Sequence, residues 1–444
     1  MKIIPEWRVY ILGATLCVAL TICSRTFGDR GGPYFMASLA VAGIAYLLAI
    51  REIFRGRGPV RLRSGQVRAT PEFPRRVVVI GLVLAVVWNV EFLRLPAGAD
   101  DDVHRYVWDG HLQRLGYNPY LVVPSDPAVK GLHTAETRTL NNPDLPSPYP
   151  AGAQLFFRAV TAIQESTFAL KVAFVVCELG IVFVLLDLLR CTGQEAHLVL
   201  AFAWNPLLAV EVAGSGHIDI VGALLLLVSA AALVRRWRAT AAVALGLAIA
   251  VKFLPIVLLP LYWKRVRIRD AALAAAAVGL LYVPFLNHGR IPIGSLGTYV
   301  QTFRFNGPVF AALDRAAPPQ LLVGLAVVVG LVTATWLRSV APECSPNLFA
   351  WPMAASLLCA PAVFPWYLLW LLPFLTSAST LLIIVWTVSI IPTYVQWHLR
   401  ALGRPWGPLP GWVMLLEYGC VATAAAIIAV RRIMRPTALP AQAD

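Results

Sequence analysis

The chain has 444 residues, of which 59% are hydrophobic and 14% are charged, and its formal net charge is +14. Soluble domains carry about one-quarter charged residues, so this composition excludes an ordinary soluble enzyme. Apolar runs long enough to cross a bilayer recur along the chain, which predicts an all-α, polytopic transmembrane bundle of about 12–14 membrane helices, some of them re-entrant. The positive charge does not indicate a nucleic-acid partner, because the arginines cluster in short segments between apolar runs, as they do in cytoplasmic loops.

The first predicted helices are 9–23, 34–50 and 76–95. Between the last two, the segment 51–76 holds eight arginines and two glutamates, which predicts a basic cytoplasmic loop. Crossing parity then places the start of the chain inside and the polar segment 96–166 outside. We predict that 96–166 is an external catalytic loop with interfacial helices, because long loops between membrane helices commonly carry function and the apolar stretch 152–163 is too short to span.

The external loop begins with three consecutive aspartates, Asp100, Asp101 and Asp102, which precede the helical pattern V-H-R-Y-V-W-D-G-H-L-Q-R-L. Carboxylates at the edge of a membrane are costly to place there, and they are suited to accept a proton as a general base. The alternative is that they cap a helix, because an aspartate in the first turn favours the helix dipole. The residues alone leave both interpretations open.

Further helices are predicted at 167–189, 197–212, 218–234, 270–286, 318–337, 347–362, 378–396 and 412–430, with a partial crossing at 365–375. The apolar run 239–263 has basic residues on both flanks, so a single span would place one basic cluster outside. Two half-length helices that break at V-K-F-L-P (251–255) keep both clusters inside, and Pro255 supports the break. Lys252 is therefore predicted at the tip of a re-entrant hairpin that points toward the outer face.

Several polar residues map to the same outer face. Lys252 in an apolar run needs an anionic partner, and we favour a phosphate over snorkelling to the interface. Arg304, in the external segment T-F-R-F-N-G, is a second candidate cation, with a solvated loop residue as the alternative. His217 and Asp219 follow a Gly-Ser-Gly turn that opens a helix, so they are candidates to hold a phosphate or sugar hydroxyls, or simply belong to a capped turn.

Metal binding has little support in the sequence. None of the seven cysteines forms a C-x-x-C pair, and the pair His217 and Asp219 supplies only two ligands. We therefore predict no metal site, and a divalent cation stays an open alternative.

Short motifs in order along the chain carry a resemblance to a known family. They are D-D-V-H-R-Y-V-W-D-G (101–110), G-Y-N-P-Y (116–120), N-P-D-L-P-S-P-Y-P-A-G-A-Q (142–154), W-N-P-L-L (204–208), G-S-G-H-I-D (214–219), V-K-F-L-P (251–255), R-F-N-G-P-V-F (304–310) and P-W-Y-L-L-W (365–370). In their order and spacing the chain resembles the GT-C class of integral-membrane glycosyltransferases, and within it the bacterial mannosyltransferases that use polyprenyl-phosphate mannose.

The resemblance implies a single GT-C-like membrane domain over 1–444. It implies an inverting transfer of a sugar, mannose in the matching branch, from a polyprenyl-phosphate donor to a hydroxyl of a glycan or glycolipid acceptor. It also implies a place in the bacterial cytoplasmic membrane with the active site facing the exterior.

The same resemblance assigns roles to residues of the matching motifs. The base is Asp101 or Asp102, and Lys252 and Arg304 would neutralise the leaving phosphate. Residues that would contact the sugar or the phosphate are His217, Asp219, Arg105 and Tyr149. Ile218 stands where the family turn usually has an asparagine.

Two other functions remain as alternatives. A flippase for lipid-linked sugars would have two related halves around a charged cavity, and no internal repeat is visible in the sequence. A non-catalytic scaffold of the cell envelope would tolerate loss of every carboxylate named above.

Overall fold

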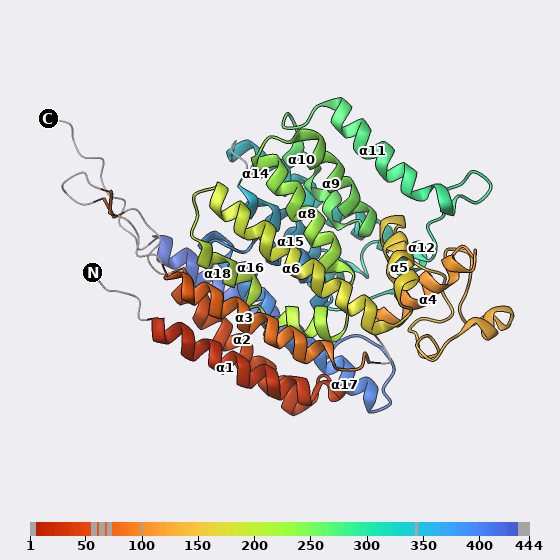
Figure 1. The fold of residues 1–444 in the computed structure, drawn as a ribbon, viewed down its shortest axis with the longest axis horizontal. Coiled ribbons are helices and arrows are strands. Elements are labelled where there is room, and N and C mark those ends of the chain that lie inside the picture. Colours follow the sequence, from red (N-terminus) through yellow and green to blue (C-terminus); the bar gives the residue numbers. More distant parts are fainter. Residues whose placement is uncertain are drawn as a thin grey trace.

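The computed structural model describes residues 6–54, 60–61, 67–68, 73–98, 101–341 and 345–433, so Asp100 and most of the predicted basic loop lie outside the described residues. The described chain is an elongated bundle of helices (Figure 1). Two short strands, β1 (Val60–Arg61) and β2 (Val67–Arg68), pair in antiparallel orientation. The predicted all-α fold is confirmed.

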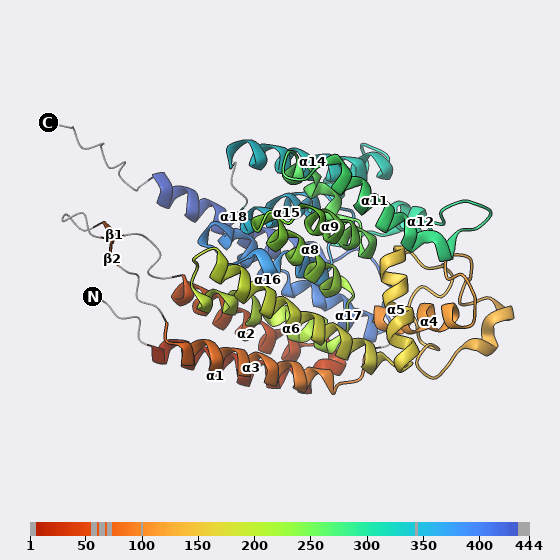
Figure 2. The ribbon, with the colours of Figure 1, turned by 45° about the horizontal axis from the view of Figure 1, so that its top comes forward.

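Three long helices form one side of the bundle: α1 (Glu6–Arg25), α2 (Pro33–Ile53) and α3 (Arg75–Leu93) (Figures 1 and 2). Pro33 begins α2, where the missing backbone N–H has no intrahelical partner to lose. Aliphatic side chains such as Val18 and Val79 are exposed on these helices. An apolar outer face of this kind is what a lipid-facing helix requires.

The remaining α-helices are α4 (Asp102–Arg114), α5 (Ala151–Ile163), α6 (Thr167–Cys191), α7 (Leu200–Ala203), α8 (Asp219–Val234), α9 (Arg238–Val251), α10 (Leu259–Tyr262), α11 (Ile268–Tyr282), α12 (Leu296–Thr302), α13 (Pro308–Leu313), α14 (Pro319–Val340), α15 (Ala350–Leu358), α16 (Leu381–Ser389), α17 (Val395–Ala401) and α18 (Gly411–Ile433). Where 365–375 was predicted to be a partial crossing, two 3-10 helices occur, η8 (Pro365–Trp370) and η9 (Leu372–Phe374). Each begins at or next to a proline, which prevents a continuous α-helix.

Long apolar helices recur from the first described residues of the chain to the last. In the described part of the chain, eight helices are long and apolar enough to cross a membrane, and a bent pair, Ala196–Ala203 with Leu208–Gly214, makes a ninth if it is one span. The helices α5, α8 and α9 are apolar but shorter. The protein is therefore a multi-pass membrane protein, and its partial crossings explain why the sequence predicts a higher number of membrane helices.

The segment around Lys252 doubles back. Ser229 Oγ on α8 donates to the carbonyl of Ala241 near the start of α9 (2.6 Å), and Tyr262 at the end of α10 bonds the same hydroxyl (2.6 Å). The chain has thus returned, by Tyr262, to the level at which α9 begins. Lys252, the residue directly after α9, lies at the turn of this hairpin, as the sequence predicts.

The polar segments gather at one end of the bundle. Helices α4, α5 and α12 lie together there, and the ends of α1 and α18 that lead to the chain termini lie at the opposite end (Figures 1 and 2). The last turn of α2 and the first turn of α3 also lie at that opposite end, where Glu52 is near Arg8 (3.8 Å) and Glu6 pairs with Arg76 (2.9 Å). Helix α4, which begins at Asp102, and these two helix ends are therefore at opposite ends of the bundle.

Candidate functional site

A cavity of about 580 Å³ opens at the end of the bundle formed by α4, α5 and α12. One wall is the loop that runs from Thr139 to Pro150, and another is the hairpin tip with Lys252 and Phe253. The opposite wall is aromatic, and its members are Tyr299, Phe303, Phe364, Trp366, Tyr367, Trp397 and Trp406. Pockets of this size and composition are typical of small-molecule sites.

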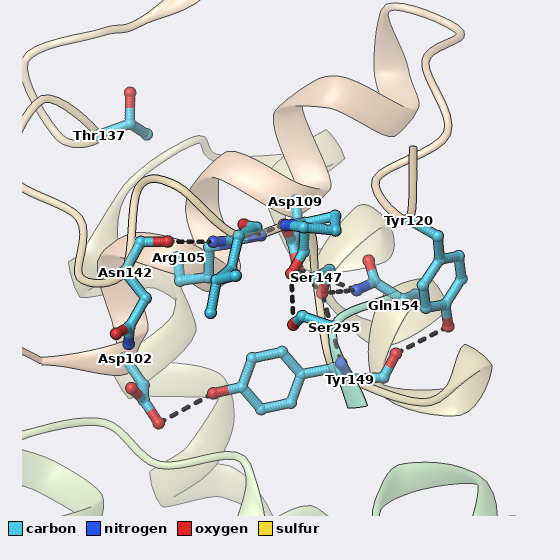
Figure 3. Close-up of polar contacts among 12 residues, drawn as sticks. Asp102, Arg105, Asp109, Tyr120, Thr137, Asn142, Ser147, Tyr149, Gln154 and Ser295 are labelled. Carbon is cyan, nitrogen blue, oxygen red and sulfur yellow. Dashed lines mark hydrogen bonds and ion pairs between the residues drawn. The ribbon is translucent and has the colours of Figure 1, made fainter. Parts of the chain in front are cut away.

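Asp102 is the aspartate that faces this cavity. It begins α4, and its two carboxylate oxygens accept hydrogen bonds from Asn141 Nδ2 (2.6 Å) and from Tyr149 Oη (2.9 Å), the second of which is drawn in Figure 3. Burial, and then the nearby Asp102 charge, raise the pKa of Tyr149 well above its usual value. Tyr149 therefore stays a neutral donor, and the two bonds fix the orientation of the carboxylate.

Asp101 lies elsewhere, although it is adjacent in sequence. It is 2% exposed and is absent from the cavity wall. Its Oδ1 accepts from Arg30 Nη1 (2.6 Å), and its Oδ2 accepts from the backbone N–H of Gly98 (2.6 Å). Asp101 occupies the N-cap position of α4 but makes no side-chain capping bond. Of the two predicted candidates for the base, the geometry favours Asp102.

Lys252 lines the cavity and has a buried partner. Its Nζ donates to Asp219 Oδ1 (2.7 Å) and lies 3.8 Å from the centre of the Tyr367 ring. Asp219 is 1% exposed and also accepts from Trp370 Nε1 (2.7 Å). Asp219 therefore stabilises the charged ammonium group rather than facing the cavity itself.

His217 also lies behind the wall. Its Nδ1 is 2.9 Å from a carboxylate oxygen of Glu211, and its ring stacks on Trp366 with centroids 4.0 Å apart. Trp366 lines the cavity and His217 does not. His217 thus supports an aromatic wall residue, where the sequence predicted a direct contact with sugar or phosphate.

Arg304 is the predicted site residue that the structure separates from the others. It is not part of the cavity wall. Its guanidinium donates to the carbonyls of Val300, Gln301 and Phe303 and lies near Asp314 (3.4 Å). The expectation that Arg304 faces Lys252 is therefore corrected: carbonyls at the end of α12 and of Phe303, together with the carboxylate of Asp314 after α13, hold the guanidinium.

The sequence reasoning missed Arg400, which lines the cavity beside Trp397 and Trp406. It lies on α17, in the segment Q-W-H-L-R. The available signal was an arginine close to two tryptophans in the segment between the predicted helices 378–396 and 412–430. Arg105 also lines the cavity, but it is 3% exposed and its guanidinium is bonded to the protein itself.

The family of the chain follows from a sequence comparison. A family model described as "Alpha-(1->6)-mannopyranosyltransferase, N-terminal domain" (MptA_B family) matches residues 25–266, which is more than half of the chain. The chain belongs to this family. It is therefore a glycosyltransferase, and the predicted resemblance to mannosyltransferases is confirmed.

Among solved structures, the glycosyltransferase is similar to ArnT from Cupriavidus metallidurans bound to undecaprenyl phosphate. The TM-score is 0.43 and the sequences are 17% identical, over 83% of this chain and 67% of that chain. No curated protein sequence matches the chain significantly.

The matched segment contains Asp102, Tyr149 and Lys252, and it ends before the aromatic wall and Arg400. In the described part of the glycosyltransferase, no group of three or more histidine, cysteine, aspartate or glutamate side chains is placed to hold a metal ion. Its cavity instead combines one oriented carboxylate with the cationic side chains of Lys252, Arg105 and Arg400.

Proposed function

We propose that the glycosyltransferase moves mannose, with inversion, from a polyprenyl-phosphate donor to a hydroxyl of a glycan or glycolipid acceptor. The reaction would take place at the outer face of the bacterial cytoplasmic membrane. The observation that carries the proposal is that Asp102 and Lys252, which lie on α4 and after α9, line one cavity. A base and a cation at one cavity are what a single displacement at the sugar carbon requires.

Asp102 acts as the general base in this proposal. Its carboxylate removes the proton from the acceptor hydroxyl as the oxygen forms its bond to the anomeric carbon. The bond from that carbon to the phosphate oxygen breaks, and its electron pair stays on the phosphate. A positioned base commonly contributes a factor of about 10² to 10⁴ to the rate.

Lys252 acts on the phosphate. Negative charge grows on the phosphate oxygens during the transfer, and a fixed cation stabilises that growth more than it stabilises the bound donor. One N–H of the ammonium group is directed at Asp219, so further N–H groups are available to a ligand. Arg400 replaces Arg304 as the second cation of the proposal because it lines the same cavity.

The aromatic wall supports a carbohydrate acceptor. Sugar rings pair apolar C–H faces with polar hydroxyl edges, and here Trp397 and Trp406 stand among hydrogen-bonding groups such as Asn142 and Ser295 at the same cavity. Apolar surface with a few fixed polar groups is the usual composition of a specific small-molecule site. The cavity therefore suits an acceptor sugar beside the donor sugar.

The test uses purified protein in lipid nanodiscs, with polyprenyl-phosphate mannose carrying a radiolabel in the sugar and a synthetic mannoside acceptor. We expect transfer from the lipid donor and none from GDP-mannose. Asp102→Asn should lower turnover by about 10² to 10⁴-fold. Asp144→Asn, a change of an exposed aspartate in the same loop, is the matched control. Transfer from GDP-mannose would contradict the donor assignment, and normal turnover of Asp102→Asn would contradict the base assignment.

A further inference from the structure

A buried polar cluster underlies the loop that orients Asp102. Asp109, on α4, is 0% exposed. Its carboxylate accepts from Arg105 Nε (3.0 Å), Ser147 Oγ (2.5 Å) and Gln154 Nε2 (2.9 Å) (Figure 3). We refer to these four residues as the Asp109 cluster. They come from α4, the following loop and α5, so the cluster joins three segments that differ widely in sequence position.

The cluster holds the loop next to each of its two contacts with Asp102. Arg105 donates to the carbonyl of Asn142 through Nη1 (3.4 Å) and to that of Leu145 through Nη2 (2.9 Å). Asn142 directly follows Asn141, the donor to one oxygen of Asp102.

On the other side, Ser147 Oγ accepts from the side chain of Gln154 (2.6 Å) and from the backbone N–H of Tyr149 (3.4 Å). Tyr149 is the donor to the second oxygen of Asp102. Both donors to Asp102 are therefore attached, within two residues, to groups that Asp109 holds.

We propose that Asp109 is a positioning residue for the transfer reaction, which holds the loop 141–149 so that Asn141 and Tyr149 orient the carboxylate of Asp102. The inference rests on the proposed role of Asp102 as the base. Asp109 itself is absent from the cavity wall, so it acts only through other residues.

A stabilising role alone is a poor explanation for this cluster. A buried ion pair is often no more stable than well-packed apolar residues of the same volume, because both charges must be removed from water. The ion pair of Asp109 and Arg105 instead fixes the orientation of the Arg105 side chain. The carboxylate of Asp109 orients the fork of Arg105, and that fork determines where two loop carbonyls lie. A base needs such fixed geometry, since a displacement of about 1 Å can reduce the rate by about 10²-fold.

The first variant is Asp109→Asn, which keeps the size of the side chain. The introduced amide has only one oxygen, so its N–H groups face a donor in either orientation, Arg105 Nε or Gln154 Nε2, and the loop shifts. We expect kcat to fall by about 10²-fold. The KM for the donor should change little, because Lys252 lies on a different wall. The double variant Asp109→Asn/Gln154→Glu exchanges donor and acceptor between the two positions and should recover most of kcat.

A second measurement separates positioning from independent effects. In the background of Asp102→Asn, the change Asp109→Asn should cause no further loss of the residual rate, because the base it positions is already missing. Multiplicative losses in the two variants would overturn the proposal, as would a normal kcat for Asp109→Asn. Asp144→Asn again serves as the matched control, with melting temperature recorded for every variant.

If Asp109→Asn does not accumulate in membranes, Ser147→Ala replaces it. This change removes one donor to Asp109 and the acceptor for the backbone N–H of Tyr149. The same criteria apply to it: it should lower kcat in the wild-type background and cause no further decrease in the Asp102→Asn background. Normal turnover of Asp102→Asn would refute the proposed base. An inactive Asp102→Asn together with a fully active Asp109→Asn would refute the positioning role alone.

Discussion

Removing the charge of Lys252 tests how the donor phosphate is stabilised. Lys252→Met keeps most of the length of the side chain and deletes the ammonium group that lies 2.7 Å from Asp219. Two unit charges about 4 Å apart interact by about 4 kcal/mol at an effective dielectric constant of about 20. Loss of one preorganised donor in other enzymes costs about 10² to 10³-fold in kcat. We therefore expect turnover to fall by at least about 10²-fold.

The same change also affects stability, and the two effects must be separated. Asp219 is 1% exposed, and after this change its carboxylate would still accept from Trp370 Nε1 but would have lost its cation. Removing one partner of a fully buried ion pair costs about 3–5 kcal/mol. The cost should be smaller here, because the Lys252 side chain is 24% exposed and water screens part of the interaction.

The assay therefore includes Lys252→Met/Asp219→Asn, which removes the isolated carboxylate. Radiolabelled transfer is measured at matched protein level, together with the melting temperature in detergent. We expect the double variant to regain stability while its turnover stays low, and Lys252→Arg to keep partial activity. Recovery of activity in the double variant would show that the isolated carboxylate of Asp219 caused the loss. Normal turnover and donor KM for Lys252→Met would refute the phosphate contact.

Three further results are expected. Arg400→Gln should raise the KM for the lipid donor several-fold, and an unchanged donor KM would remove Arg400 from the phosphate site. Arg30→Met should lower stability by about 3–5 kcal/mol, since it isolates the buried Asp101, and Arg30→Met/Asp101→Asn should restore part of it in thermal unfolding. In a cysteine-free background, an impermeant thiol reagent applied to intact cells should label Ser125→Cys and leave Ser64→Cys unlabelled; the reverse pattern would invert the proposed topology.

The helices could be predicted from the sequence because the thickness of the membrane sets the length of the apolar runs, and the positive-inside rule sets where arginines cluster. Positive charge on both flanks of 239–263 was sufficient to predict a hairpin with Lys252 at its tip, and the structure has that hairpin. The segment 365–375, predicted as a partial crossing, forms two 3-10 helices, because Pro365 and Pro373 prevent a continuous α-helix.

The site was predicted less completely, because its contacts join residues far apart in sequence. The sequence alone does not distinguish Asp101 from Asp102, because they are adjacent residues of the same type. In the structure, the direction in which α4 begins turns Asp101 toward Arg30 and Asp102 toward the cavity. Arg304 was chosen for its charge and its side of the membrane. The end of α12 and Phe303 provide carbonyl acceptors for its guanidinium, and charge and side of the membrane alone do not reveal these local acceptors.

Four aspartates in and behind the cavity wall differ in the charge of the side chains that bind them. Asp101, Asp109 and Asp219 are each buried and each bonded to a cation: Arg30, Arg105 and Lys252 respectively. Asp102 differs, because its carboxylate accepts hydrogen bonds from the neutral side chains of Asn141 and Tyr149. A carboxylate that is held by neutral donors keeps its orientation without being neutralised by a cation. Of these four carboxylates, Asp102 is therefore the one whose charge remains available to attract a proton from an acceptor hydroxyl.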